Sequence, residues 1–403
     1  QGDLIPLAGA RGQSPRGLAL RPRRDSEQSL REISRHRREK ALTGFERKKP
    51  MNKISLGVVF GGVSSEHEVS LMSAASVLSN LDPERYDIHK IGITKDGRML
   101  YCTGSAESVK DGSWEQKDCT PCVLSPDRSH HGLLLPGQKI IRLDVVFPVL
   151  HGKNGEDGTI QGLLALAGIP CVGCGVLASA CCMDKVVTHV LLDAAGIPQA
   201  QWMWTTEHEY RRAPETSLAQ IRQRLGFPCF VKPANAGSSV GVTKAVDPES
   251  LREGMELAFR HDHKVIVEGM VHGIELECAV LGNKEPIASC VGEIAPEADF
   301  YDYNAKYIDG TTQTYAPARI CEAASEGVRE TALRAYKVLG CTGLARVDFF
   351  LTEEEHQVVL NEVNTIPGFT SISMYPQLFA VSGVPYPELL DRLIDSALEK
   401  EGD

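Results

Sequence analysis

Beyond its N-terminal segment, the chain alternates short apolar runs with stretches in which apolar residues recur at helical spacing. Strand-like runs occupy 53–60, 87–94 and 144–150, and segments with helical spacing begin at Glu68 and Glu156. Strands that alternate with helices are typical of a doubly wound α/β domain, so we expect such a domain of about 120 residues at 51–174.

The central part of the chain, 175–264, combines helices with a buried strand. A helix is predicted from near Gly175 through the sequence Met-Asp-Lys to Gly196, where Gly-Ile-Pro ends it. The run at 227–233 predicts a strand that ends at a glycine loop, and helical spacing returns near 248–260.

The last part, 265–403, is predicted to hold a second sheet. Strand-like runs at 264–271, 275–282 and 286–294 are separated by turn residues and together predict one antiparallel sheet. A helix, a pair of strands and a closing helix are predicted to follow, at 325–339, 344–352, 358–365 and 386–399.

Composition excludes several classes of protein. Of the 403 residues, 42% are hydrophobic and 24% are charged, which is an ordinary globular balance. No apolar run reaches the roughly 18 residues of a membrane helix, and the opening QGDLIPLAGA lacks the order of a secretory signal. The net charge of -10 argues against nonspecific nucleic-acid binding. We therefore expect a cytoplasmic protein without a membrane or nucleic-acid partner.

Charge is divided unevenly along the chain. Residues 1–50 carry 13 Lys and Arg against 6 Asp and Glu, a balance of +7, which leaves -17 for the rest. The segment has few aromatic or β-branched residues, so we expect a basic, disordered extension or an artefact of an upstream start, with Met51 as the natural start. A tail that binds an acidic surface and a transit peptide are the alternatives, and the acidic residues count against the second.

The twelve cysteines are interpreted as reduced thiols. Cys119 and Cys122, like Cys171 and Cys174, have the spacing of zinc ligands, but the gap between the two pairs is longer than in a zinc ribbon. Other cysteines lie within apolar segments, where a thiol behaves as a small hydrophobe. Free thiols, rather than zinc or disulfides, are therefore expected.

Three segments carry the residue types of phosphate and metal chemistry. Lys232 ends a strand and is followed by a Gly/Ser loop at 233–241, whose backbone N–H groups could surround phosphate oxygens, although such a loop is often a plain turn. On the next candidate pair of strands, Arg346-Val-Asp348 and Glu362-Val-Asn364 place paired side chains on one face.

Asp, Glu and Asn are the oxygen donors that Mg²⁺ prefers. The alternative is a solvated face with cross-strand ion pairs, but Asp348 and Glu362 follow apolar runs, which favours a metal site. The turn that follows contains Gly368, Ser371 and Ser373, whose N–H and hydroxyl groups could bind substrate oxygens; the alternative is an ordinary Pro-Gly turn.

In this order, the motifs resemble those of the ATP-grasp D-alanine–D-alanine ligases over residues 51 to about 400. The matching segments are GGVSSEHEVSLMSA, LHGKNGEDGTIQG, MDK, VKPANAGSSVGV, EGMVHGIELECAV, FYDYNAKY, GLARVDFF and LNEVNTIPGFTSISMYP. The resemblance implies an α/β N-terminal domain followed by a two-lobed ATP-grasp domain of α+β type, with lobes at 175–264 and 265–403. It also implies a homodimer.

The resemblance assigns roles residue by residue. Lys185 and Lys232 would contact the ATP phosphates, and Glu268 and Glu275 the adenine amino group and the ribose. Ser239, Val271 and Phe300 would complete the nucleotide site. Gly269 stands where the family often has Lys, so we expect that contact from backbone alone.

Two Mg²⁺ or Mn²⁺ ions would be bound by Asp348, Glu362 and Asn364. Arg346 and the Gly368 N–H would stabilise the tetrahedral intermediate.

The implied reaction joins two D-alanines through an acyl phosphate, for peptidoglycan precursor synthesis. Glu66 would pair with the first ammonium, with His151 close by, and Ser373 and Met374 would position the second carboxylate. Ser238 and Tyr307 would form a hydrogen-bonded triad with Glu66, and a loop bearing Lys306 and Tyr307 would close over the site.

The intact sequence Ala-Lys306-Tyr307 favours D-alanine as the second substrate. The alternatives are D-lactate or D-serine at that subsite, another carboxylate–amine ligase, and a nucleotide-binding regulatory module without turnover. An interaction protein that acts through its basic tail is a further alternative.

Overall fold

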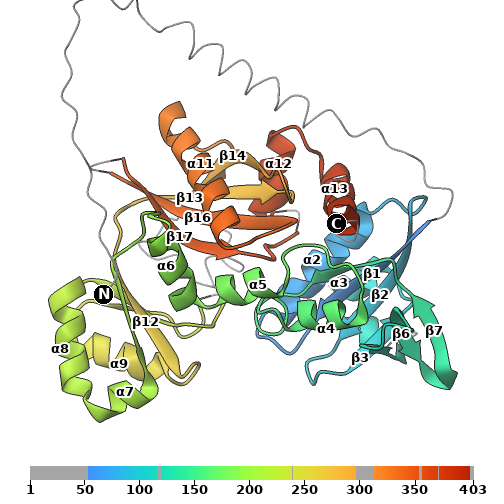
Figure 1. Cartoon of the computed structure of the whole chain (residues 1–403), viewed down its shortest axis with the longest axis horizontal. Helices are drawn as coiled ribbons and strands as arrows, with labels where there is room; N and C mark the ends of the chain where they lie inside the picture. Colours follow the sequence, from blue (N-terminus) through green and yellow to red (C-terminus); the bar gives the residue numbers. More distant parts are fainter. Residues whose placement is uncertain are drawn as a thin grey trace, which may run out of the picture. The chain divides into compact units, whose positions relative to one another are not determined.

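The computed structural model describes residues 53–116, 119–237, 239–295, 313–353, 356–370 and 372–399, all within the unit Lys49–Asp403. Four β-sheets organise this part of the chain (Figure 1). Among the described helices, none is long and apolar enough to cross a lipid bilayer.

The first sheet has the strand order β4-β3-β2-β1-β8. Strand β1 runs parallel to both β2 and β8, whereas β3 and β4 add an antiparallel edge. Leu56, Val58, Val59 and Phe60 of β1 are fully buried, as expected of a central strand covered on both faces. The strands are β1 (Ile54–Gly61), β2 (Tyr86–Ile93), β3 (Met99–Cys102), β4 (Cys119–Pro121) and β8 (Val145–Val149).

Three helices, α2 (His67–Asn80), α3 (Ala106–Lys110) and α4 (Thr159–Ala167), belong to this region. A small sheet of β5 (Val123–Leu124), β6 (Gly132–Leu135) and β7 (Lys139–Arg142) accompanies them, with 3-10 turns η1 (Ser113–Gln116) and η2 (Pro136–Gln138). The predicted doubly wound core is confirmed by β1, β2 and β8 with their helices, while the short edge strands were not predicted.

A disulfide joins Cys102 and Cys119, so the expectation that all thiols are free is wrong for this pair. The two residues lie directly opposite each other on the antiparallel strands β3 and β4, with their Cα atoms 4.3 Å apart. The pairing register of β3 and β4 brings the two cysteines together, and the spacing of cysteines along the sequence does not reveal that register. The other ten cysteines are free thiols.

Two helices form where one was predicted. Helix α5 (Val176–Met183) ends and α6 (Lys185–Ala194) begins at Asp184, whose backbone is extended. Asp184 Oδ1 accepts hydrogen bonds from the N–H groups of Val186 and Val187, both at 3.1 Å, and caps α6. The apolar spacing continues across this break, which explains why the sequence predicted a single helix.

The second sheet has the order β11-β10-β12-β9, and all of its pairs are antiparallel. Apolar residues of three helices pack against one face through a core that includes Tyr210, Leu251 and Met255. The elements are β9 (Trp202–Thr206), α7 (Glu207–Arg212), α8 (Pro214–Leu225), β10 (Cys229–Pro233), β11 (Thr243–Ala245), α9 (Pro248–Ala258) and β12 (Lys264–Gly269).

The third sheet has the order β15-β14-β13-β16-β17 and is also antiparallel. Helix α11 packs on it through Val328, Ala332 and Tyr336. The elements are β13 (Gly273–Leu281), β14 (Ile287–Ala295), β15 (Gln313–Tyr315), α11 (Glu322–Val338), β16 (Leu344–Thr352), β17 (Val358–Asn364), α12 (Met374–Val381) and α13 (Tyr386–Glu399).

The prediction of one sheet from 264–271, 275–282 and 286–294 is wrong. The first run is β12, which pairs with β10 and β9, whereas the other two runs pair within the third sheet. The chain crosses between the sheets at 270–272, and this crossing forms one wall of the cavity described below.

The closing helix α13 contacts the first sheet through a polar cluster. Tyr86 Oη donates to Asp391 Oδ1 at 2.7 Å, and Arg85 forms ion pairs with Asp391 and Asp395. All four side chains are largely removed from solvent, so this cluster joins the last helix of the chain to the second strand.

Candidate active site

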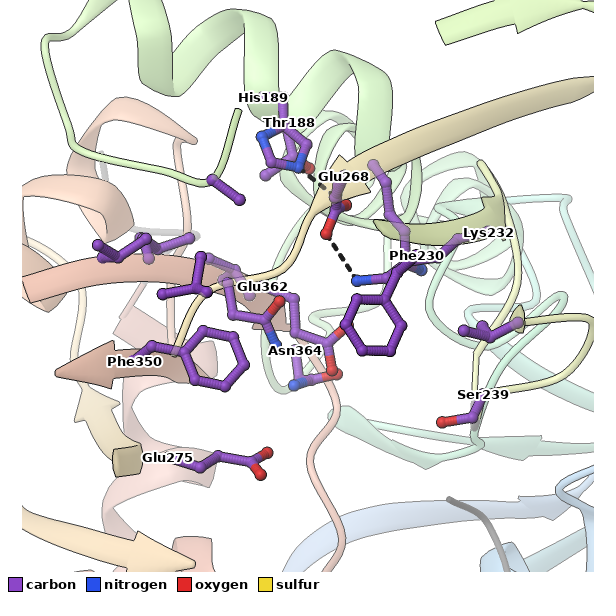
Figure 2. Close-up of a pocket in the computed structure, with 18 of the residues that line it drawn as sticks. Thr188, His189, Phe230, Lys232, Ser239, Glu268, Glu275, Phe350, Glu362 and Asn364 are labelled. Atoms are coloured by element: carbon purple, nitrogen blue, oxygen red, sulfur yellow. Dashed lines mark hydrogen bonds and ion pairs between the residues drawn. The ribbon is translucent and has the colours of Figure 1, made fainter. Parts of the chain in front are cut away.

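A cavity of about 540 Å³ is lined by residues of the second and third sheets and by the start of α6. Figure 2 shows side chains from β10, β12, β13 and β17 pointing into the same space. Phe230 and Phe350 add aromatic rings to a wall that otherwise carries several charged groups. An apolar cavity with a few convergent polar groups is the usual form of a small-molecule site.

Lys232 and Glu268 form a buried ion pair in this cavity, with Nζ 2.7 Å from Oε2. They sit at diagonal positions of the antiparallel pair β10–β12, on the same face. His189 Nε2 lies 3.1 Å from the other carboxylate oxygen of Glu268 (Figure 2). Burial alone would raise the pKa of Glu268, but the charge of Lys232 and the His189 contact outweigh it, and the pKa is well below its ordinary value.

Sequence reasoning missed His189, which is 3% exposed and stacks on Trp202 with ring centroids 5.1 Å apart. The sequence around His189, one helical turn after Lys185, does not indicate that it pairs with Glu268, which lies 79 residues further along the chain. Only the fold brings the two together.

Lys185 is the first residue of α6, and its Nζ donates to the carbonyl oxygen of Ala236 in the glycine loop at 2.7 Å. Ser239 of that loop has a positive φ of 58° and also lines the cavity. All the described residues predicted to bind nucleotide therefore line one cavity: Lys185, Lys232, Ser239, Glu268, Val271 and Glu275.

The predicted metal ligands lie on neighbouring strands, and two of the three, Glu362 and Asn364, line the same cavity. Asp348 and Glu362 are directly opposite in the β16–β17 pair, as are Arg346 and Asn364. Arg346 donates to both oxygens of Asp348 at 2.7 Å, and Asn364 Nδ2 lies 2.9 Å from Asp348 Oδ2. Glu362 and Asn364 face the cavity (Figure 2).

This donor set fits magnesium. Its oxygens are hard donors, and Mg²⁺ is usually bound by one or two carboxylates together with water and substrate phosphates. Within the described ranges no cluster of three or more His, Cys, Asp or Glu could hold an ion unaided, so phosphate oxygens would have to complete the coordination.

Arg346 is held by carboxylates on two neighbouring strands, Asp348 and Glu277, the latter at 3.3 Å. Burial would lower the pKa of Arg346, but these two carboxylates more than offset it and raise the pKa further. The guanidinium is therefore a fixed positive charge beside the cavity.

Glu66 lies at the start of α2 and is buried. A Cβ atom added at Gly237 would lie 2.7 Å from Glu66 Oε2, and one added at Gly152 would also collide with that oxygen. The Glu66 carboxylate is therefore enclosed between the His151-Gly152 turn and the glycine loop, whose next residue is Ser238. A side chain at either position would force the Glu66 carboxylate to move, and the positive φ of 68° at Gly152 also favours glycine there.

Glu156 is a second residue that sequence reasoning did not single out. It lines the cavity, and its Oε2 accepts a hydrogen bond from the Gly152 N–H at 2.8 Å. Burial, together with the charges of Glu66 and Glu362, raises the pKa of Glu156 to about 8. The spacing of carboxylates along the chain does not reveal this, because the effect comes from three distant segments that meet here.

The turn after β17 holds Gly368 and Ser373 together. Ser373 Oγ accepts the Thr370 N–H at 3.0 Å, and a Cβ added at Gly368 would lie 2.7 Å from that oxygen. The Met374 side chain is 5% exposed and packs against Gly292 of β14. The Met374 side chain is therefore packed in the interior rather than available to a substrate.

His151 lies between this turn and helix α2. Its Nδ1 is 3.0 Å from the carbonyl oxygen of Ile366, and its Nε2 is 3.1 Å from Ser73 Oγ. Burial lowers the pKa of His151 and favours the neutral ring. The predicted residues Ser238, Phe300, Lys306, Tyr307 and Ser371 lie outside the described residues.

Two antiparallel sheets with a charged cavity between them, preceded by a doubly wound sheet, define the ATP-grasp class of fold. Family models named D-ala D-ala ligase N-terminus and D-ala D-ala ligase C-terminus match residues 55–174 and 191–395. The chain belongs to the D-alanine–D-alanine ligase family.

Individual relatives agree with this assignment. A D-alanine–D-alanine ligase of Acetivibrio thermocellus is 50% identical over 361 residues, which cover 86% of this chain and 96% of the relative. A second, of Ruminiclostridium cellulolyticum, is 48% identical over 88% and 97% of the two chains.

Solved structures are similar as well. The VanG D-Ala:D-Ser ligase of Enterococcus faecalis has a TM-score of 0.79 and 44% identity, covering 86% of this chain and all of that one. The D-alanine–D-alanine ligase of Coxiella burnetii has a TM-score of 0.76 and 36% identity, covering 86% and 94%.

Proposed function

We propose that the protein joins two D-alanines to D-alanyl-D-alanine at the expense of ATP, releasing ADP and phosphate, and so supplies a peptidoglycan precursor. The observation that carries this proposal is the enclosure of Glu66 by the glycine loop at Gly237. An ammonium-binding carboxylate there would place the carboxylate of the same amino acid next to the loop that surrounds the ATP phosphates. Family membership supports the same reaction.

In the first step, a carboxylate oxygen of the first D-alanine attacks the γ-phosphorus of ATP, the bond to the bridging oxygen breaks, and ADP leaves. Lys185 and Lys232 bind the phosphates, while Glu66 holds the ammonium of the amino acid. In the second step, the neutral amine of the second D-alanine attacks the acyl carbon, the bond from that carbon to the phosphate oxygen breaks, and inorganic phosphate leaves with the proton that the nitrogen gives up. Arg346 and the Gly368 N–H face the oxyanion that forms on the way.

Asp348, Glu362 and Asn364 would hold two Mg²⁺ or Mn²⁺ ions. When bound, the ions neutralise charge on the transferred phosphoryl group. Arg346 donates two hydrogen bonds to Asp348, which is buried. The protein therefore holds this carboxylate in a fixed position, away from bulk water.

Four residues outside the described ranges complete the proposal. Ser238 and Tyr307 join Glu66 in a hydrogen-bonded triad, and Phe300 covers the adenine. Lys306 and Tyr307 close over the acyl phosphate and exclude water. The Gly237 contact supports this arrangement, because it brings the loop that carries Ser238 against Glu66.

The second substrate is proposed to be D-alanine, bound by Ser373 and the backbone of Met374. D-serine is the second candidate, because the similar solved structure from Enterococcus faecalis is named a D-Ala:D-Ser ligase. Competition between D-alanine, D-serine and D-lactate, with products identified by mass, separates these functions. A product made mainly of D-alanyl-D-serine or of depsipeptide at neutral pH would reject the proposed selectivity.

We also infer a cytoplasmic homodimer with domains at 51–174, 175–264 and 265–403, preceded by a basic extension at 1–50. ATP and D-alanine are its ligands. Sedimentation of the full chain tests the oligomeric state, and deletion of residues 1–50 is expected to leave turnover unchanged.

The decisive experiment measures phosphate release from ATP with D-alanine, L-alanine or no amino acid, with and without Mg²⁺. We expect release only with D-alanine and metal, and a dipeptide product. A Lys232→Met variant serves as the inactive control. ATP binding without release in the wild type would instead favour a regulatory module.

A further inference from the structure

Helix α2 contacts the turn that carries Gly368 through two hydroxyl groups on one helical face. Ser73 Oγ accepts the Phe369 N–H at 3.3 Å. Three residues later, Ser76 Oγ lies 3.2 Å from Tyr386 Oη, which donates to the Phe369 carbonyl oxygen at 2.6 Å. Both backbone polar groups of the residue after Gly368 are thus held by this helix, directly or through Tyr386.

The hydrogen-bond directions around Ser73 follow from the chemistry of its partners. The Ile366 carbonyl can only accept, so His151 Nδ1 must carry the proton between them, at 3.0 Å. In the neutral ring Nε2 is then an acceptor. The Ser73 hydroxyl, 3.1 Å away, donates to it while accepting the Phe369 N–H.

These contacts form one continuous chain from the Ile366 carbonyl through His151 and Ser73 to the Phe369 N–H. The chain begins and ends in the same backbone turn and encloses Gly368 between its two ends. Ser73 is fully buried and His151 is 5% exposed, so water does not compete for these groups.

From this geometry we propose that Ser73 is a positioning residue that fixes the His151 tautomer and aims the Gly368 N–H at the reacting carbonyl. The proposal rests on the proposed function, since it assigns Gly368 to the oxyanion. In this proposal, Ser73 of the first domain aligns the Gly368 N–H, a hydrogen-bond donor that belongs to the last domain. It also commits His151 Nε2 to Ser73, so that His151 acts by orientation rather than by removing a proton.

Ser73→Ala tests the proposal, with Ser79→Ala as the matched control. Ser79 lies on the same helix, and its hydroxyl only bonds its own helix at Ala75. We expect Ser73→Ala to lower kcat by about tenfold to a hundredfold, because a donor is misaligned rather than removed. The KM for ATP should stay close to that of the wild type. The melting temperature should fall by only a few degrees, because the Phe369 N–H and His151 Nε2 lose a buried partner. Ser79→Ala should match the wild type throughout.

A second measurement does not depend on turnover, and its first part needs only the wild type. Nitrogen-15 NMR of histidine-labelled wild type should show His151 neutral and protonated at Nδ1. In Ser73→Ala that tautomer preference should weaken.

Several outcomes would overturn the inference. Wild-type kcat in Ser73→Ala, an equal loss of ATP binding and kcat, or protonation of Nε2 in the wild type would each reject it and leave the ligase activity standing. Absence of D-alanine-dependent turnover in the wild type would instead reject the proposed function, and with it the role given to Gly368.

Discussion

Replacing Glu268 with glutamine tests the charge balance of the cavity between the second and third sheets. The substitution keeps the size of the side chain but leaves the Lys232 ammonium without its counter-charge, 2.7 Å away. Breaking a buried pair by removing one partner typically costs about 3–5 kcal/mol. Because the Lys232 side chain is 17% exposed at the cavity, we expect a cost at or just below the bottom of that range, about 2–3 kcal/mol of unfolding free energy.

The lowered pKa of Glu268 also predicts how this stability difference changes with pH. The pKa of Glu268 is lowered in the folded protein, so its stabilising effect is present above the unfolded pKa and is lost as the pH falls below it. The difference between wild type and Glu268→Gln should therefore be constant near pH 7. It should shrink by about 1.4 kcal/mol per pH unit below about pH 4.3.

Denaturant unfolding of both proteins between pH 7 and pH 3.5 measures this difference. Glu285→Gln is the control, because it makes the same chemical change at an exposed position and should behave as the wild type. ATP affinity of Glu268→Gln should also fall, since Lys232 loses the partner that orients it. Equal stability at pH 7, or a difference that does not shrink in acid, would refute the reasoning.

Three further outcomes are expected. Glu156→Gln should be more stable than the wild type at pH 8 but equal to it at pH 4 by melting temperature, because a carboxyl whose pKa is raised from 4.5 to about 8 loses stability as the pH rises through that window. Asp348→Asn should lower kcat by about a hundredfold or more and raise the Mg²⁺ concentration needed for half-maximal rate, in a metal titration. Thiol titration of the unfolded chain should find ten free thiols before reduction and twelve after it, because Cys102 and Cys119 are paired; twelve before reduction would contradict the disulfide.

Sequence patterns predicted those elements whose burial is visible as a pattern of apolar residues along the chain. Strands β1 and β8 are continuous apolar runs because both of their faces are covered, and they were found with errors of one residue at their ends. The metal candidates were found because residues two apart on a strand share a face, and the register of β16 and β17 then brings Asp348 and Glu362 opposite each other.

The sequence did not reveal which strands, cysteines or charged residues pair with one another in the fold. The run that became β12 looks like its neighbours β13 and β14, because alternation identifies a strand but not the sheet that it joins. The same limit hid the Cys102–Cys119 pair. His189 and Glu156 were missed for a related reason, since each depends on charges that only the folded chain brings near.

The pairing of Lys232 with Glu268 has a consequence for nucleotide binding. The lysine proposed to bind phosphate is already ordered by an ion pair, and Glu268 is in turn fixed by His189, which stacks on Trp202. Ordering a free lysine side chain costs up to about 2 kcal/mol, and this cost is met during folding rather than at binding. A phosphate oxygen can then share an ammonium that is held in place, because Nζ has three donors and the carboxylate uses one. We therefore expect the ion pair to prepare the site for ATP in addition to its effect on stability, and Glu268→Gln should impair binding even under conditions where the fold is intact.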